Sequence, residues 1–163
     1  MLKAPEALVQ AIAAARPRAV HVAPCVASNA ALAGLVRRLG TEGVTAPLEA
    51  LSAPVALTLA LGGGLISNHP TVALLGSAGL CSAAEVLASA GPFGEYHSAV
   101  VLIEGVSAQE PGLCPDNRAA LAQLGRVPTL EPGGADEIEQ MTRLAFRLSA
   151  TAGMPASLIS PMS

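Results

Sequence analysis

The sequence predicts an α/β fold, a three-layer α/β/α sandwich built around a mainly parallel sheet. Segments that fit helices alternate with short apolar runs that fit buried strands along all 163 residues. Hydrophobic residues make up 52% of the chain and aromatic residues only 2%. Ala, Val, Leu and Ile must therefore build the core, as in parallel sheets that are covered on both faces. No repeat or linker divides residues 1–163, which predicts a single domain.

The first half of the chain alternates helices and strands. The first helix stops before Pro17, and the second begins at Ser28 or Asn29, either of which can cap it, and ends at Gly40. A proline suits the first turn of the third helix, which weakens at a run of three glycines. We expect helices at 7–15, 28–39 and from 54 to the glycines at 62–64, and strands at 19–23, 44–48 and 71–75.

The second half continues the alternation and contains one long loop. Asp116 can cap a short helix, and the last helix is acidic at its start, which suits its dipole. The loop is long enough to suggest a functional role. We expect helices at 79–90, 116–124 and 136–150, strands at 98–103, 127–130 and 156–159, and the loop at 104–115.

Composition excludes several classes of function. A net charge of −3 gives no basic face for nucleic acid. Three widely spaced cysteines form no zinc or iron–sulfur motif and predict no metal site, and they suit a reducing cytoplasm. Residues 50–68 carry no charge, but a proline and three glycines interrupt them, so we expect a buried helix and no membrane span. Charged residues are only 13%, which predicts apolar surface buried against another chain.

In a parallel sheet, ligands bind at the carboxyl ends of the strands, where strand order reverses. Three predicted loops qualify, at 24–29, 76–80 and 104–117. The chain has no G-x-G-x-x-G and no P-loop, and Gly62 to Gly64 follow a helix, so helix packing or a helix stop explains them better than a phosphate site. Ser77 in G-S-A-G lacks the first glycine of a nucleophile elbow. Cys25 fits either a nucleophile at a helix start or a small buried residue.

Carboxylates are scarce in the middle of the chain, which makes each a candidate for acid–base chemistry. Glu49 precedes the apolar helix, Glu85 lies in the helix after G-S-A-G, Glu95 lies in a turn, and Glu104 ends a predicted buried strand. A carboxylate near a buried strand end can have a shifted pKa. A solvated or capping role is the alternative for each.

The chain resembles the pyrimidine-binding (Pyr) domain of thiamine-diphosphate (ThDP) enzymes from about His21 to Ile159. Its carboxy-terminal half is similar to indolepyruvate ferredoxin oxidoreductase, while its V-A-P-C loop and its size are similar to the α subunits of sulfopyruvate and phosphonopyruvate decarboxylases. The residues that carry the resemblance are P-D-N-R at 115–118, V-P-T-L-E-P at 127–132, A-F-R-L-S at 145–149, M-P-A at 154–156, A-L-T-L-A-L-G-G-G-L at 56–65 and L-L-G-S-A-G-L at 74–80.

This resemblance implies a shared cofactor site. In the family a Pyr domain holds the aminopyrimidine ring, and a PP domain holds the diphosphate and Mg²⁺. No G-D-G…N-N pattern of a PP domain is present, so a partner subunit would supply it, in a heterotetramer or a larger assembly. The implied ring contacts are Pro24, Cys25, Ala53, Ser77, Ala78 and Gly79, with Leu80 and Cys81 at an interface and residues 105–117 facing substrate or partner.

The chain departs from the family at the position of its catalytic glutamate. Alignment of the apolar helix places that glutamate at Ala53, and an Ala cannot hydrogen-bond the ring nitrogen. Glu49 lies four residues earlier, and a register shift at Pro54 would bring it to the ring as the catalytic acid. Otherwise, an acid must come from a partner, or the chemistry is slower or absent.

The resemblance therefore predicts the Pyr-type (α) subunit of a heteromeric ThDP-dependent enzyme that decarboxylates or carboligates a small 2-oxo acid. A subunit of a 2-oxoacid:ferredoxin oxidoreductase is an alternative if the redox centres lie on other subunits. A second class is a non-catalytic assembly or regulatory subunit with a degenerate Pyr fold. A third class is a Rossmann-like binder of another small molecule.

Overall fold

The computed structural model describes residues 3–24, 30–41, 45–67, 69–93, 100–106 and 126–161. In chain order, the described elements are α1 (Ala4–Ala15), β1 (Ala19–Val22), α2 (Ala30–Thr41), β2 (Leu48–Glu49), α3 (Ala53–Ile66), β3 (Thr71–Gly76), α4 (Ser77–Ser82), α5 (Ala84–Phe93), β4 (Val100–Val106), β5 (Thr129–Leu130), α7 (Ala135–Ala152) and β6 (Ala156–Pro161). The predicted helix at 116–124, Cys25 and most of the long loop lie outside the described residues.

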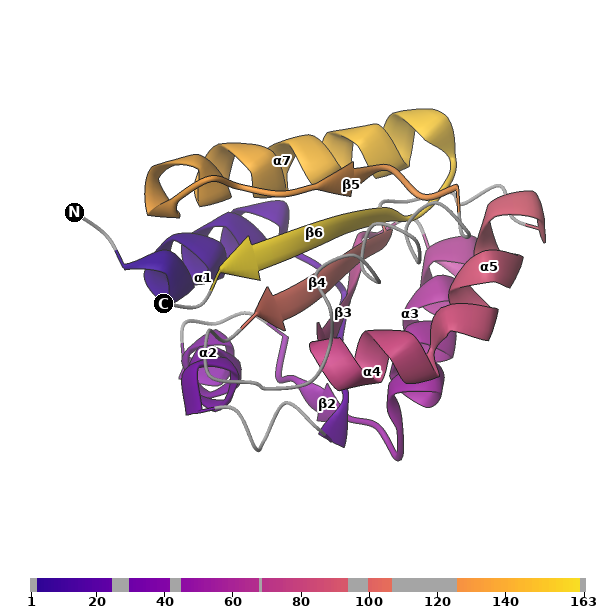
Figure 1. Ribbon diagram of the computed structural model, residues 1–163, viewed down its shortest axis with the longest axis horizontal. Coiled ribbons are helices and arrows are strands. Elements are labelled where there is room, and N and C mark those ends of the chain that lie inside the picture. Colours follow the sequence, from indigo (N-terminus) through magenta and orange to yellow (C-terminus); the bar gives the residue numbers. More distant parts are fainter. Residues whose placement is uncertain are drawn as a thin grey trace.

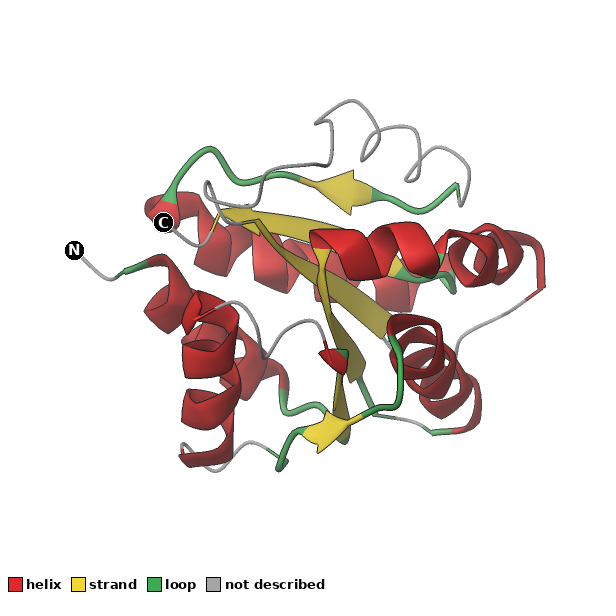
Figure 2. Ribbon diagram, turned by 60° about the horizontal axis from the view of Figure 1, so that its bottom comes forward, coloured by secondary structure: helices red, strands yellow, loops and turns green. Residues whose placement is uncertain are grey.

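The six strands form one sheet in the order β2-β1-β3-β4-β6-β5, and every pairing is parallel. Helices α1, α2 and α7 cover one face of the sheet, and α3, α4 and α5 cover the other (Figures 1 and 2). The predicted α/β/α sandwich with a parallel sheet is therefore confirmed. The crossover through α2 leads from β1 outward to β2, and α3 leads back to β3 on the other side of β1.

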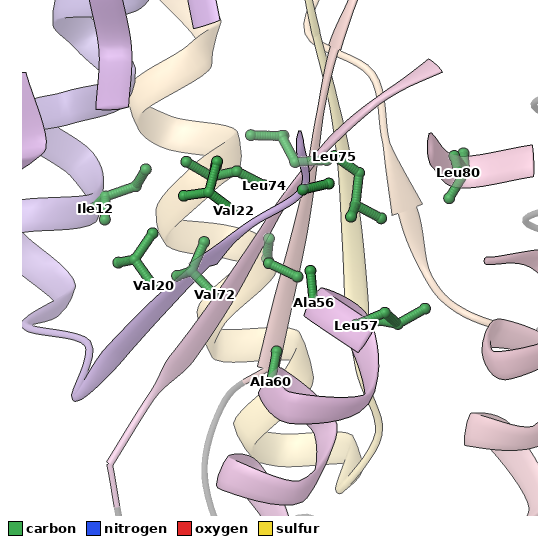
Figure 3. Packing of buried hydrophobic residues seen from close by; sticks show 14 of the residues in the cluster. Ile12, Val20, Val22, Ala56, Leu57, Ala60, Val72, Leu74, Leu75 and Leu80 are labelled. Atoms are coloured by element: carbon green, nitrogen blue, oxygen red, sulfur yellow. The ribbon is translucent and has the colours of Figure 1, made fainter. Parts of the chain in front are cut away.

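The core is aliphatic, as the composition predicts. Ile12 from α1 packs with Val20 and Val22 on one side of the sheet, and Ala56 and Leu57 from α3 lie on the other (Figure 3). All six residues of β3 are buried, because helices cover both faces of this central strand. Packing in the core holds β1 and β3 in place and thereby fixes the positions of their carboxyl ends.

Helix α3 differs from the prediction because it continues through the three glycines to Ile66. Ser52 caps its amino terminus, where its Oγ accepts a hydrogen bond from the Val55 amide at 3.4 Å. An added Cβ at Gly63 would lie 3.0 Å from Thr71 Cγ2. The glycine therefore allows close packing of α3 on β3 and is not a stop signal.

Two other helices also depart from the prediction. Helix α2 does not end at Gly40 but includes it and continues to Thr41. The helix predicted at 79–90 is two helices, α4 and α5, separated at the buried Ala83. Strand β4 continues to Val106, so residues expected to begin the long loop belong to the sheet.

The last helix is held to the last strand by its carboxyl-terminal cap. Gly153 adopts a left-handed conformation with φ of 63°, and its amide donates to the Ser149 carbonyl at 3.0 Å. The Ser149 hydroxyl donates to the Met154 carbonyl at 2.7 Å. This turn directs the chain into β6, whose residues Ala156 to Ser160 are buried.

Candidate functional site

The candidate site lies at the carboxyl edge of the sheet, between β1 and β3. The chain leaves β1 toward β2 on one side and returns to β3 on the other, so strand order reverses at this point. In open parallel sheets this reversal leaves a crevice in which ligands bind. The sequence-predicted residues are expected to converge here, and their positions follow from the strand register.

Pro24 lies directly after β1 at this edge. Val22 pairs with Leu74 in the parallel register, and the Ala23 amide donates to the Leu74 carbonyl at 3.0 Å. Two further residues along each strand bring Pro24 level with Gly76, where β3 ends. Pro24 is exposed, so its ring is accessible at the edge. Cys25, the next predicted contact, lies outside the described residues.

The G-S-A-G turn lies on the neighbouring strand end. Gly76 is extended, and α4 begins immediately at Ser77. Ala78 is exposed and Gly79 is buried. Leu80, which we expected at an interface, is only 4% exposed and belongs to the core, so that expectation is wrong. By the strand register, Pro24 and the start of α4 at residues 77–79 therefore follow the ends of two neighbouring strands.

The two residues central to the catalytic prediction, Glu49 and Ala53, differ in their surroundings. Glu49 ends β2, is exposed, and pairs with Val22 in register. The Ala50 amide continues the pairing, donating to the Val22 carbonyl at 2.9 Å. Ala53 is the first residue of α3 and is 5% exposed within the core. A buried methyl group therefore occupies the start of α3, while the carboxylate predicted as the catalytic acid belongs to the edge strand.

Glu49 faces the helix layer opposite to α3. It lines an open cavity of about 270 Å³ with Val22 and three residues of α2. Residues paired in register on neighbouring strands share a face of the sheet, and Val22 lies on the side of Ile12 (Figure 3). Ala53 belongs to α3 on the other side. The structure thus places both residues at the same end of the sheet but over different faces.

His21 is the one buried histidine among the described residues. It is 8% exposed, and its Nδ1 has no hydrogen-bond partner within the described part of the chain. Burial lowers the pKa of His21, because desolvation disfavours the charged imidazolium. The residue is therefore neutral at pH 7 and adds no charge to the site.

The chemistry available at this edge suits a flat apolar ring. The predicted contacts that the structure describes are a proline, two alanines, a glycine and the Ser77 backbone. Pro24 and Ala78 are exposed and offer apolar surface, whereas Gly79 and Ala53 are buried, and none of these residues has a basic side chain for a diphosphate. Among the described residues, no three His, Cys, Asp or Glu side chains come together as a metal site, and no helix there is long and apolar enough to cross a membrane.

Sequence reasoning missed the cavity beside Glu49. Its other lining residues are Ala23, Ala33, Val36, Arg37 and Pro47. Ala33, Val36 and Arg37 follow the 3.6-residue period and lie on one side of α2. That helix periodicity is a signal for a shared face, but the packing of α2 beside β2 is a long-range contact with no local sequence marker.

The fold is shared with solved enzyme structures. A protein from Mycobacterium smegmatis, provisionally assigned as a thiamin diphosphate-dependent enzyme, superposes with a TM-score of 0.63 at 16% identity and covers 98% of this chain. Benzoylformate decarboxylase from Polynucleobacter necessarius superposes with a TM-score of 0.62 at 16% identity and also covers 98% of this chain. This chain spans about a third of their lengths, 32% and 33%. No protein-family model and no curated protein matches the sequence.

Proposed function

We propose that this chain is the Pyr-type subunit of a ThDP-dependent enzyme that acts on a small 2-oxo acid. The observation that carries the proposal is the similarity in fold to two enzymes, one provisionally assigned as thiamin diphosphate-dependent and the other a benzoylformate decarboxylase. The similarity covers 98% of this chain and about a third of each enzyme. Two groups of predicted ring contacts, Pro24 and residues 77–79, follow the ends of β1 and β3, where strand order reverses, and this position supports the proposal. Decarboxylation or carboligation is the proposed reaction class.

The residues at the carboxyl edge fit the ring of the cofactor and do not fit its diphosphate. Pro24, Ala78 and Gly79 would provide the apolar and backbone contacts to the aminopyrimidine, with Ala53 nearby at the start of α3. Thiamine diphosphate supplies the carbanion chemistry when bound, and the chain orients its ring. The diphosphate and Mg²⁺ are assigned to a PP-domain partner, because the ring-contact residues include no basic side chain.

Glu49 is the candidate acid for the ring in this proposal. It is exposed at the carboxyl end of β2, at the same edge as the ring contacts. Its orientation toward α2 requires the ring, or the β2–α3 connection, to shift toward the edge strand for a hydrogen bond to form. A charge-assisted hydrogen bond from a glutamate is the interaction that an alanine at position 53 cannot make.

An uncharged face of α3 supports the proposed partner. Leu59 is 47% exposed and Ile66 87%, and they lie at helical spacing with Val55 on one side of α3, while Leu51, which is 93% exposed, lies just before the helix. No charged residue interrupts positions 50–68. Exposed apolar side chains that are grouped in this way suit a protein interface. We assign it to the PP-domain subunit, in a heterotetramer or larger assembly.

The experiment is co-expression with the neighbouring gene product, followed by a screen of 2-oxo acids for release of CO₂. We expect turnover only in the purified complex supplied with thiamine diphosphate and Mg²⁺. Glu49→Gln should lower turnover about tenfold or more, the effect of losing one charge-assisted hydrogen bond. Glu85→Gln, on the exposed face of α5, is the matched control. Turnover insensitive to Glu49→Gln would remove the Glu49 assignment and leave the enzyme.

Ala53 favours a second candidate, a non-catalytic assembly subunit. A buried methyl at the start of α3 is the expected result if the chain keeps the fold and has lost its acid. A complex that forms without binding the cofactor would support this function.

A further inference from the structure

The cavity between β1, β2 and α2 combines an apolar interior with two charged groups of opposite sign. Val22 and Ala23 form the sheet side, and Ala33 and Val36 form the helix side. Val22 is 6% exposed and Ala23 is fully buried, so the inner wall is fixed by the core. The volume of about 270 Å³ is at or below the usual range for drug-sized ligands, which suits a molecule of few atoms.

Arg37 and Glu49 line the same cavity and are both exposed. Within the described part of the chain, neither makes a salt bridge or a side-chain hydrogen bond. The adjacent Arg38 behaves differently, because its Nη1 lies 2.9 Å from Glu6 Oε1 on α1. The guanidinium of Arg38 thus links α2 to α1, whereas the guanidinium of Arg37 lies at the cavity that Glu49 also lines.

We propose that this cavity binds a zwitterionic α-amino acid with a small aliphatic side chain. The guanidinium of Arg37 would receive the ligand carboxylate, since arginine and carboxylate match in charge and geometry. The carboxylate of Glu49 would accept hydrogen bonds from the ligand ammonium group. The aliphatic side chain would enter between Val22 and Val36.

Charge complementarity separates this ligand class from a 2-oxo acid. A 2-oxo acid carries the carboxylate that Arg37 requires but has no cation for Glu49, whose negative charge would repel it. An alkylamine has the opposite deficiency. Only a ligand with both charges satisfies both groups. The inference shares Glu49 with the thiamine diphosphate proposal, but Arg37 and Ala33 have no role in that proposal, so binding to the chain without the cofactor and the Arg37 variant test the inference separately.

The test is isothermal titration calorimetry of the full chain, without thiamine diphosphate, against valine, the 2-oxo acid that replaces its amino group, and the amine that lacks its carboxylate. The probes are L-valine, 3-methyl-2-oxobutanoate and isobutylamine. We expect L-valine to bind and each singly charged probe to bind about tenfold more weakly or worse, the effect of losing one hydrogen bond to a charged group. Absence of L-valine binding to the folded chain, or equal binding of the 2-oxo acid, would overturn the proposal.

Matched variants locate the site. Arg37→Gln should weaken L-valine binding about tenfold or more, whereas Arg38→Gln, on the same helix but paired with Glu6, should leave it unchanged. Ala33→Leu should abolish binding by filling the cavity, and methyl NMR shifts of Val22 on titration provide a second readout if that variant is unstable. Equal losses for Arg37→Gln and Arg38→Gln, or valine binding without a shift at Val22, would contradict this site.

Discussion

Two adjacent glycines of α3 provide a matched pair for testing how this helix packs. Gly62 and Gly63 both lie inside the helix, where Gly is about 1 kcal/mol less favourable than Ala. An added Cβ at Gly62 meets nothing within 4 Å, whereas at Gly63 it lies 3.0 Å from Thr71 Cγ2. Thr71 cannot easily move away, because it is 1% exposed and its Oγ1 donates to the Ala60 carbonyl at 2.8 Å.

Gly62→Ala should therefore raise the free energy of unfolding by about 1 kcal/mol. Gly63→Ala gains the same helix propensity but adds an overpacking cost of about 1–3 kcal/mol, so its net effect is neutral to destabilising. The assay is urea unfolding of each isolated variant, followed by circular dichroism. The packing account is refuted if Gly62→Ala destabilises the chain, or if both variants gain the same stability.

Three further outcomes follow from single residues. Burial lowers the pKa of His21, so the unfolded chain binds the proton more readily. The free energy of unfolding should be constant above about pH 6.5, the usual pKa of histidine, and should decrease as the pH is lowered below that value. Urea titrations from pH 5 to 8 should show a smaller fall for His21→Phe, and an equal fall would exclude His21 as the cause. Thr71→Val removes a buried hydrogen bond and should lower the free energy of unfolding by about 1 kcal/mol. An unchanged free energy of unfolding would show that this bond does not stabilise the fold. Leu59→Glu, on the exposed face of α3, should prevent co-purification with the proposed PP-domain subunit while the chain keeps its melting temperature, and an intact complex would disprove that interface.

Periodicity and composition predicted the order and type of the described elements well, because local patterns determine them. Strand β3 was expected at 71–75 and is found at Thr71–Gly76, because an uninterrupted apolar run between turn residues predicts a buried strand. For the glycines of α3 the predicted helix stop is wrong, and the alternative of helix packing is confirmed at Gly63. Their effect depends on Thr71, which packs against Gly63 from another element, and tertiary contact overrides propensity.

The placement of Pro24 and residues 77–79 at neighbouring strand ends could be predicted from the sequence, but the face to which Glu49 points could not. Parallel strands bring their carboxyl ends to one edge, so the convergence of Pro24 with the 77–79 turn follows from the strand order. The face to which Glu49 points depends on the register of a two-residue strand, β2. A shift of the register by one residue would place Glu49 on the opposite face of the sheet, and nothing in the local sequence specifies that register.

The central claim is a cofactor site shared between this chain and a PP-domain partner. Calorimetry of thiamine diphosphate and Mg²⁺ binding tests it most directly, with this chain alone and with the complex co-purified with its neighbouring gene product. The account predicts no binding to the chain alone, whose ring contacts include no diphosphate ligand, and clear binding to the complex. An intact complex that binds no thiamine diphosphate would contradict the account and leave the assembly role in its place.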